Sequence, residues 1–297
     1  MAVLASWLRA IRIRFLLASV IAVSNGLAIS YWKYGQFDPL YAALTYAGVA
    51  FLHASVDLLN DYSDYRRGID TATTRTKFSG GTGVLPEKAL TPRAVYAAGV
   101  TFLVLGVLVG AYFVAVRGVT VAVILGFAVA AIYFYSTSIV NAGLGELFVG
   151  IKGALIVLGT FFVQTGTLAE PAAVYVGVIA GLLSATVLFV NAFPDFQADR
   201  SKGRHTLVII MGRARGARAF PFFIVAAYAL IAAGVFLGFT KIYSIASFAS
   251  LPFAARAVAA LRRDHETTEG LVEAMGATVM YSRITGFVLA ASLLFSF

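Results

Sequence analysis

Long apolar stretches alternate with short polar segments along the whole chain. Nine stretches of about 17 to 25 residues are each long enough to cross the hydrocarbon core of a bilayer as a helix. They cover residues 15–32, 40–59, 94–116, 119–136, 144–166, 172–193, 219–239, 242–261 and 277–296. The pattern predicts an all-α, polytopic membrane protein with a bundle of about nine helices.

The composition supports this prediction and removes several kinds of chemistry. The chain is 60% hydrophobic and only 12% charged, with a mean hydropathy of +0.86, whereas soluble domains carry about 25% charged residues. It contains no cysteine, which excludes disulfides, thiolate metal sites and a thiol nucleophile. The protein is therefore expected to be integral to the membrane.

The basic residues predict how the chain is oriented. If the nine stretches cross the membrane, 17 lysines and arginines fall on one side and 3 on the other, and three more lie inside the stretches. The positive-inside rule then puts the amino terminus in the cytoplasm and the carboxyl terminus outside. The net charge of +9 comes from loops between apolar stretches, so we expect a cytoplasmic-membrane protein and no nucleic-acid partner.

Acidic residues are rare, but five of the eight aspartates gather in two places. The first aspartate motif, residues 60–70, contains Asp61, Asp64 and Asp70. The second aspartate motif, residues 191–206, contains Asp195 and Asp199. Each motif follows an apolar stretch, and both fall on the predicted cytoplasmic side. The shared Asn-x-x-x-Asp spacing suggests two similarly oriented halves that meet at one membrane face.

Helix geometry indicates what the motifs bind. Residues four apart share a helix face, so Asn60 and Asp64 point together, as do Asn191, Asp195 and Asp199, with a bend expected at Pro194. Oxygen ligands from two facing stripes suit a magnesium ion that carries a diphosphate. The alternative for either motif alone is a polar helix cap in a solvated loop.

Two polar loops carry candidate anion-binding groups. Residues 70–93 include Arg75, Lys77 and the glycine-rich run 78–83, whose amides can approach an anion closely. Residues 200–206 include Lys202 and Arg204. The alternatives are a flexible turn for the first loop and a positive-inside anchor for the second.

Several polar side chains lie within or at the ends of the predicted spans. Lys152 should face the bundle, either as a diphosphate partner or as the counter-ion of Glu146. Tyr133 and Tyr135 fit either an interfacial aromatic belt or the wall of a substrate cavity. His53 is expected to be an interior histidine with its hydrogen bonds satisfied, and with Asp57 it extends the first acidic stripe.

Four segments carry a resemblance to a known family. They resemble, in order and spacing, the UbiA superfamily of intramembrane prenyltransferases, and most of all its 1,4-dihydroxy-2-naphthoate polyprenyltransferase branch, which serves menaquinone biosynthesis. The likeness runs from Arg12 to Gly212, while the last three spans match only in hydropathy. The segments are NDYSDYRRGID, SGGTGVLPEKALTPR, YSTSIVNAGLGEL and NAFPDFQADRSKGRHTLVIIMG.

The resemblance implies one membrane-embedded domain over residues 1–297, with helices around a central cavity open to the cytoplasm. Carried over by position, it makes the four aspartates Asp61, Asp64, Asp195 and Asp199 catalytic magnesium ligands together with Asn60. Asp70 becomes the last acid of the first motif. The other substrate-binding candidates are Asn191, Arg66, Lys77, Lys152, Tyr133, Lys202 and Arg204.

This chain departs from the family in places. Arg12-Ile13 stands where the family often has Arg-Pro, and Gly203-Arg204 where it has Gly-Lys. Lys152 stands where an apolar residue is expected, so its role is not covered by the resemblance.

The expected function is Mg²⁺-dependent transfer of a polyprenyl group from an allylic diphosphate to an aromatic acceptor. The acceptor implied is 1,4-dihydroxy-2-naphthoate, with geranylgeranylglyceryl phosphate and 4-hydroxybenzoate as alternatives. The diphosphate would leave to give an allylic cation, which aromatic faces can stabilise in a dry pocket. A function of another class, a cation-coupled transporter, is the remaining alternative.

Overall fold

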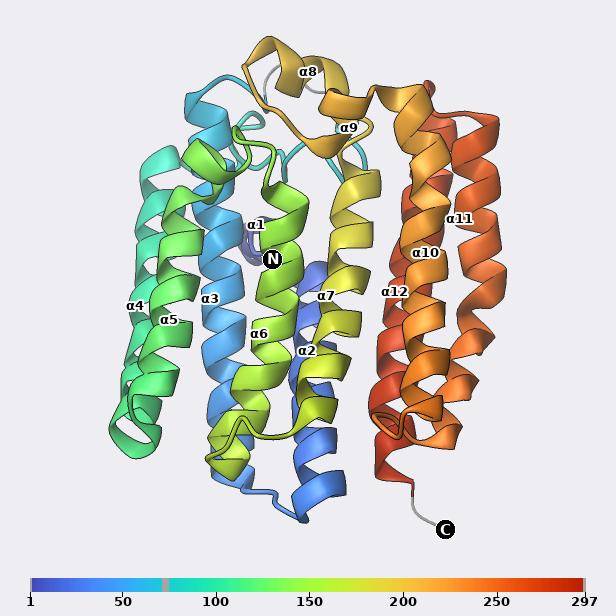
Figure 1. Ribbon diagram of the computed structural model, residues 1–297. Helices are drawn as coiled ribbons and strands as arrows, with labels where there is room; N and C mark the ends of the chain where they lie inside the picture. The colour runs from blue at the N-terminus through green and yellow to red at the C-terminus, as the bar shows by residue number, and fades with distance from the viewer. Residues whose placement is uncertain (1, 71–74, 296–297) are drawn as a thin grey trace.

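The protein is a bundle of long helices that run roughly parallel to one another (Figure 1). A computed structural model describes residues 2–70 and 75–295. The helical elements are α1 (Ala2–Ala10), α2 (Ile13–Tyr34), α3 (Pro39–Arg66), α4 (Pro92–Arg117), α5 (Val119–Phe134), the π-helix η1 (Tyr135–Ile139), α6 (Gly145–Thr165), α7 (Pro171–Asn191), α8 (Phe196–Ser201), α9 (Leu207–Met211), α10 (Arg213–Phe236), the 3₁₀-helix η2 (Ile242–Ser250), α11 (Leu251–Arg263) and α12 (Thr268–Leu294).

The described part of the chain contains eight helical segments that are long and apolar enough to cross a membrane. Seven are the helices α2, α3, α4, α6, α7, α10 and α12, and the eighth joins η2 to α11. The remaining predicted span, residues 119–136, corresponds to α5, which has 16 residues and continues into η1. The all-α membrane fold is therefore confirmed.

Two predicted spans were too short because polar residues do not by themselves end a helix. α3 continues through the first aspartate motif to Arg66, beyond the predicted limit at residue 59. α12 begins at Thr268 instead of residue 277, and the Thr267 side chain caps it by accepting from the Gly270 amide. The first motif thus belongs to a membrane-spanning helix.

Glycines allow α6 and α7 to pack closely. A side chain at Gly181 would have its Cβ 2.3 Å from the carbonyl oxygen of Gly150, and one at Gly153 would meet the Cα of Gly181 at 2.9 Å. Small residues are common where transmembrane helices touch, because lipid supplies no hydrophobic force between helices and close contact must replace it. This contact aligns α6 beside the helix that ends in the second motif.

Hydroxyl groups connect the carboxyl-terminal helices inside the bundle. The hydroxyls of Tyr228 and Ser250 are 2.6 Å apart, those of Ser250 and Thr285 2.7 Å, and those of Ser244 and Ser292 2.8 Å. In an apolar environment such bonds satisfy groups that have no water. They join α10, η2 and α12 into one unit.

Both aspartate motifs lie at one end of the bundle, which we call the motif end. α3 and α7 end there, α10 begins there, and α8, α9 and the connection after α3 cover it (Figure 1). α12 ends at the opposite end of the bundle (Figure 1). The fold therefore brings together two segments that are more than a hundred residues apart.

Candidate functional site

Asn60, Asp61 and Asp64 of the first aspartate motif lie in the last turns of α3, as their spacing predicted, and Asp70 lies beyond the helix end at Arg66. Asn60 and Asp64 share a helix face, and the Asn60 side-chain amide donates to Asp64 Oδ2 at 3.1 Å. Asp61 is 2% exposed and Asp64 4%. Carboxylates this deeply buried need cations or hydrogen-bond donors around them.

Asp61 receives its partners from two distant parts of the chain. Arg12 Nη2 lies 2.5 Å from Asp61 Oδ1, and Thr82 donates to Oδ2 through its hydroxyl and, at 3.3 Å, its amide. Arg12 sits at the break between α1 and α2 with φ +46°, a left-handed conformation that is strained for a non-glycine residue. Burial acts to lower the pKa of Arg12, but Asp61 and Asp57 outweigh it, so the pKa lies above its usual value.

The second aspartate motif is bent, and the predicted single helical face over Asn191, Asp195 and Asp199 is wrong. α7 ends at Asn191, a turn follows, and α8 begins at Phe196. Pro194 has no amide hydrogen for the helical ladder, so the helix stops at this point. Asp195 and Asp199 still share a turn, because the Asp199 amide donates to the Asp195 carbonyl at 2.8 Å.

Arg204 joins the two motifs. Its guanidinium bonds Asp64 of the first motif and, at 3.1 Å, Asp199 of the second. The chain turns back at Gly203, with φ +75°, and the Arg204 amide donates to the Asp199 carbonyl at 3.0 Å. Burial acts to lower the pKa of Arg204, but the two carboxylates raise it above its usual value. The motifs therefore converge on one shared cation.

The glycine-rich loop closes over both motifs. The Gly80 amide donates to Asp195 Oδ2 at 3.2 Å, while Thr82 bonds Asp61. A Cβ at Gly81 would lie 2.6 Å from the Asp70 carboxyl, so only glycine fits there. The sequence predicted that this loop would offer its amides to a substrate anion. Two of those amides instead bind the protein's own carboxylates.

Crowding of acids changes their protonation. Burial, followed by the charges of Asp61 and Asp64, raises the pKa of Asp70 to about 8. Burial and the neighbouring Asp199 raise the pKa of Asp195 to about 7. A buried carboxylate near other carboxylates binds protons more readily because the charged form is unfavourable. The site has more negative charge than Arg12 and Arg204 neutralise.

The structure places Arg67 beside the second aspartate motif, whereas the sequence had predicted a site role for its neighbour Arg66. Arg66 is exposed and its nearest polar contact is the Tyr62 hydroxyl at 3.5 Å. Arg67 reaches the Asn141 side chain and the Lys202 carbonyl, each at 3.4 Å. One residue rotates the helix face by about 100°, which separates the two side chains. The other predicted bases, Lys77 and Lys202, are exposed at the motif end.

The two tyrosines at the end of α5 have different surroundings. Tyr133 is 70% exposed and lies on an apolar groove between α4 and α5. In the described part of the chain, its ring contact is with Phe134 and it makes none with the aspartates. Tyr135 interacts electrostatically with Arg204 and Asp64. Tyr135 is therefore the tyrosine of this pair that lies near the charged residues of the motifs, and Tyr133 fits the alternative of an aromatic belt.

Lys152 faces the bundle, but Glu146 is not its counter-ion. Its electrostatic partners are Asp57 and His53 on α3. Lys152 and Glu146 are six residues apart on α6 and so lie on different faces, and Asp57, rather than Glu146, is the charge that acts on Lys152. One ring nitrogen of His53 has the predicted hydrogen bond, since Nδ1 lies 2.6 Å from Ser19 Oγ, while Nε2 lies 3.6 Å from Asp57 Oδ2, which is too long for a hydrogen bond.

Comparison with known proteins identifies the architecture. Residues 18–293 match the UbiA prenyltransferase family. The chain belongs to the UbiA prenyltransferase family. The match includes the last three membrane segments, whose likeness to the family had been visible only in their hydropathy. The protein is accordingly a prenyltransferase, and the resemblance based on the two aspartate motifs is confirmed.

Two curated relatives of this UbiA family member carry the same name. The 1,4-dihydroxy-2-naphthoate octaprenyltransferase of Escherichia coli is 30% identical over 72% of this chain and 70% of its own length. The enzyme of that name from Bacillus subtilis is 26% identical over 95% of this chain and 90% of its own length.

Solved structures share the UbiA fold at low identity. A UbiA homolog from Aeropyrum pernix has a TM-score of 0.69 at 19% identity, over 90% of this chain and 95% of its own. A homolog from Archaeoglobus fulgidus, described as bound to DMAPP and Mg²⁺, has a TM-score of 0.64 at 16% identity, over 96% and 99% of the two chains.

The donor atoms of this UbiA site suit a hard cation. Asn191 Oδ1 and Asp195 Oδ1 are buried and have no hydrogen-bond partner among the described residues, and the other candidate ligands are also oxygens. Over residues 2–70 and 75–295, no three His, Asp or Glu side chains form a metal cage by themselves. Magnesium commonly takes few protein ligands and completes its shell with water and phosphate oxygens. The residues present therefore fit a magnesium ion bound together with a phosphate substrate.

Proposed function

We propose that this prenyltransferase transfers a polyprenyl group from an allylic prenyl diphosphate to 1,4-dihydroxy-2-naphthoate, with Mg²⁺ as cofactor. The names of the Escherichia coli and Bacillus subtilis relatives support this acceptor. The observation that carries the proposal is the convergence of the two aspartate motifs, which Arg204 connects through Asp64 and Asp199. Separate helix caps would not require such a connection.

Magnesium is assigned to oxygens from both motifs. The ligands proposed are Asn60, Asp61, Asp64, Asp195 and Asp199, and the open Oδ1 atom of Asp195 supports this assignment. Magnesium supplies charge neutralisation, which makes the diphosphate a better leaving group. The description of the Archaeoglobus fulgidus homolog as bound to DMAPP and Mg²⁺ supports the same assignment.

The chain's own cations orient the acids and bind the donor. Arg12 fixes Asp61, and Arg204 fixes Asp64 and Asp199, so these carboxylates are held in position before substrate arrives. Arg67, Lys77 and Lys202 lie at the motif end, where charged hydrogen bonds to diphosphate oxygens would be strong. Asn191 and Asp70 complete the polar rim.

Groups deeper in the bundle are assigned to the prenyl and acceptor part of the site. The ring of Tyr135, whose hydroxyl is influenced by the charges of Asp64 and Arg204, is assigned to stabilise positive charge on the departing prenyl carbon. Lys152, with Asp57 and His53, provides a polar group on the α6 side. The acceptor attacks the prenyl carbon, the carbon–oxygen bond to diphosphate breaks, and a proton leaves the acceptor. The polyprenyl tail remains among apolar helices, and the 17-to-3 distribution of basic residues supports a cytoplasmic position for the motif end.

The test uses purified protein with a labelled polyprenyl diphosphate. The double variant Asp64→Asn/Asp195→Asn should lose transfer by about a hundredfold or more, because two groups that hold the charged transition state are removed. Glu269→Gln, an exposed carboxylate at the same end of the bundle, is the matched control and should retain activity. Transfer near the wild-type rate in the double variant, or after complete chelation of divalent ions, would refute the magnesium mechanism.

The acceptor is tested in the same assay. Equal concentrations of 1,4-dihydroxy-2-naphthoate, 4-hydroxybenzoate and geranylgeranylglyceryl phosphate are supplied, and mass spectrometry identifies the product. A dominant naphthoate product supports the proposal, and either other product reassigns the acceptor. Cation flux in sealed vesicles without consumption of prenyl diphosphate would favour the transporter alternative.

A further inference from the structure

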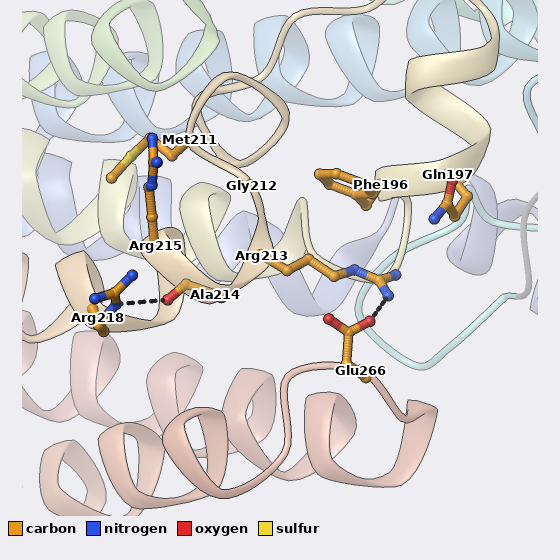
Figure 2. Close-up of a pocket in the computed structure, with 9 residues that line it drawn as sticks. All are labelled: Phe196, Gln197, Met211, Gly212, Arg213, Ala214, Arg215, Arg218 and Glu266. Atoms are coloured by element: carbon orange, nitrogen blue, oxygen red, sulfur yellow. Dashed lines mark hydrogen bonds and ion pairs between the residues drawn. The ribbon is translucent and has the colours of Figure 1, made fainter.

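A recess of about 360 Å³ lies at the motif end, between α8, α9 and the beginning of α10 (Figure 2). Its lining includes the arginines Arg213, Arg215 and Arg218, the apolar side chains of Phe196 and Met211, and Glu266. Two lining residues, Phe196 and Gln197, belong to the second aspartate motif, and neither is one of its carboxylates. The recess is therefore separate from the carboxylate site but adjoins it.

The recess carries an excess of positive charge. Glu266 neutralises only Arg213, whose Nη1 it meets at 2.6 Å. Arg215 and Arg218 are exposed, and neither has a carboxylate partner in the described part of the chain. The Arg218 Nε donates to the Ala214 carbonyl at 3.4 Å, which leaves its terminal nitrogens available. Figure 2 shows Arg215 and Arg218 together on one side of the recess, while Arg213 reaches Glu266. This chemistry selects an anion.

The surroundings of the recess select an anion that has an apolar tail. Along α10, Phe222 is 74% exposed and Val225 63%. α10 is a membrane-spanning helix that begins at the recess, so these side chains face lipid just below the arginines. Basic groups at the membrane surface attract anionic lipids by about 1 kcal/mol for each arginine. Free phosphate could use the arginines but not the apolar surface.

We infer that this recess binds the headgroup phosphate of an anionic membrane phospholipid, whose acyl chains lie along α10. Through Arg213, the bound lipid would also be connected to the second aspartate motif. Arg213 donates to the Phe193 carbonyl at 3.1 Å, and its guanidinium lies 5.2 Å from the centre of the Phe196 ring. Both residues flank the turn that carries Asp195, so the bound lipid restrains that turn.

The test measures lipid retention and does not depend on activity. Full-length protein is equilibrated with mixed micelles that contain equal phosphatidylglycerol and phosphatidylcholine, and native mass spectrometry counts the adducts. Wild type should prefer phosphatidylglycerol about tenfold. Arg215→Gln/Arg218→Gln should reduce this preference to about onefold, and Arg215→Lys/Arg218→Lys should retain much of it.

The matched control removes the same charge elsewhere at the motif end. Arg93 and Arg262 are exposed and lie at the start of α4 and the end of α11, so Arg93→Gln/Arg262→Gln should retain the preference. The inference is overturned if the Arg215/Arg218 glutamine variant keeps the preference, or if the control loses it equally. Displacement of the lipid by millimolar inorganic phosphate would also overturn it, because the site would then be one for free phosphate. Melting curves establish that each variant is folded.

Discussion

The two aspartate motifs share a sequence spacing but differ in how the protein holds them. The first lies on an unbroken helix, and its acids are bound by Arg12, Thr82 and Arg204. The second follows a helix break at Pro194, and Asn191 Oδ1 and Asp195 Oδ1 have no partner among the described residues. The first motif is therefore a fixed wall of the site, and the second is its open side. Two motifs with the same sequence spacing can therefore have different structural roles.

The largest expected effect is on stability, in the first motif. Asp61→Ala leaves the Arg12 guanidinium, whose side chain is 24% exposed, without its carboxylate, which should lower the free energy of unfolding by about 3 kcal/mol. Denaturation in detergent measures this. The double variant Arg12→Ala/Asp61→Ala should recover part of the loss, because no charge is then left unpaired. An Asp61→Ala protein as stable as wild type would show that the first motif is not a fixed wall.

In the second motif the expected loss is in catalysis. Asp195→Ala should reduce prenyl transfer by about 10²–10³-fold, because the residue presents an open oxygen where charge is stabilised. Its melting temperature should not fall, since Asp195 has no cation bound to it as Asp61 has. The measurement is the transfer rate at saturating donor beside a melting curve. A loss below about threefold would contradict the assignment of the open side.

The protonation of Asp195 gives a pH dependence. Its folded pKa is raised from 3.8 to about 7 by burial and by Asp199, so between these values the folded state binds more protons than the unfolded state. Stability therefore falls as pH rises from about 4 to 7 and then levels. Asp195→Asn has no such group. In the absence of metal, the difference between its free energy of unfolding and that of wild type should therefore grow in favour of the variant by up to about 3 kcal/mol between pH 5 and pH 8. An advantage that is constant with pH would contradict this.

The smallest expected effect concerns the helix break. Pro194→Ala restores an amide hydrogen and allows α7 to continue, which would turn Asp195 and Asp199 away from Arg204. Activity should fall about tenfold, which is the scale of a misplaced catalytic group. Pro221→Ala, at a proline inside α10, is the control and should have little effect on transfer. Equal losses in both variants would indicate general destabilisation.

How much was predictable differs between the fold and the site. Eight of the nine predicted spans, the shared end of the bundle and the common helix face of Asn60 and Asp64 could be predicted, because span length and i, i+4 spacing are local properties of a helix. Arg204 was among the bases named beside the second motif. Arg67 and Tyr135 could not be chosen over their near neighbours Arg66 and Tyr133. A change of one residue turns the side chain by about 100°, and only packing fixes which one faces inward.

The sequence alone determined that this protein lies in the membrane, is helical and presents two acidic motifs, because apolar length and residue type act locally. The tertiary structure decided which basic side chain pairs with which carboxylate. Arg12 reaches Asp61 across 49 residues and Arg204 reaches Asp64 across 140, while the glycine-rich loop donates to Asp61 and Asp195. These partners follow from how the helices pack, since buried charges need neighbours that the chain brings from far away.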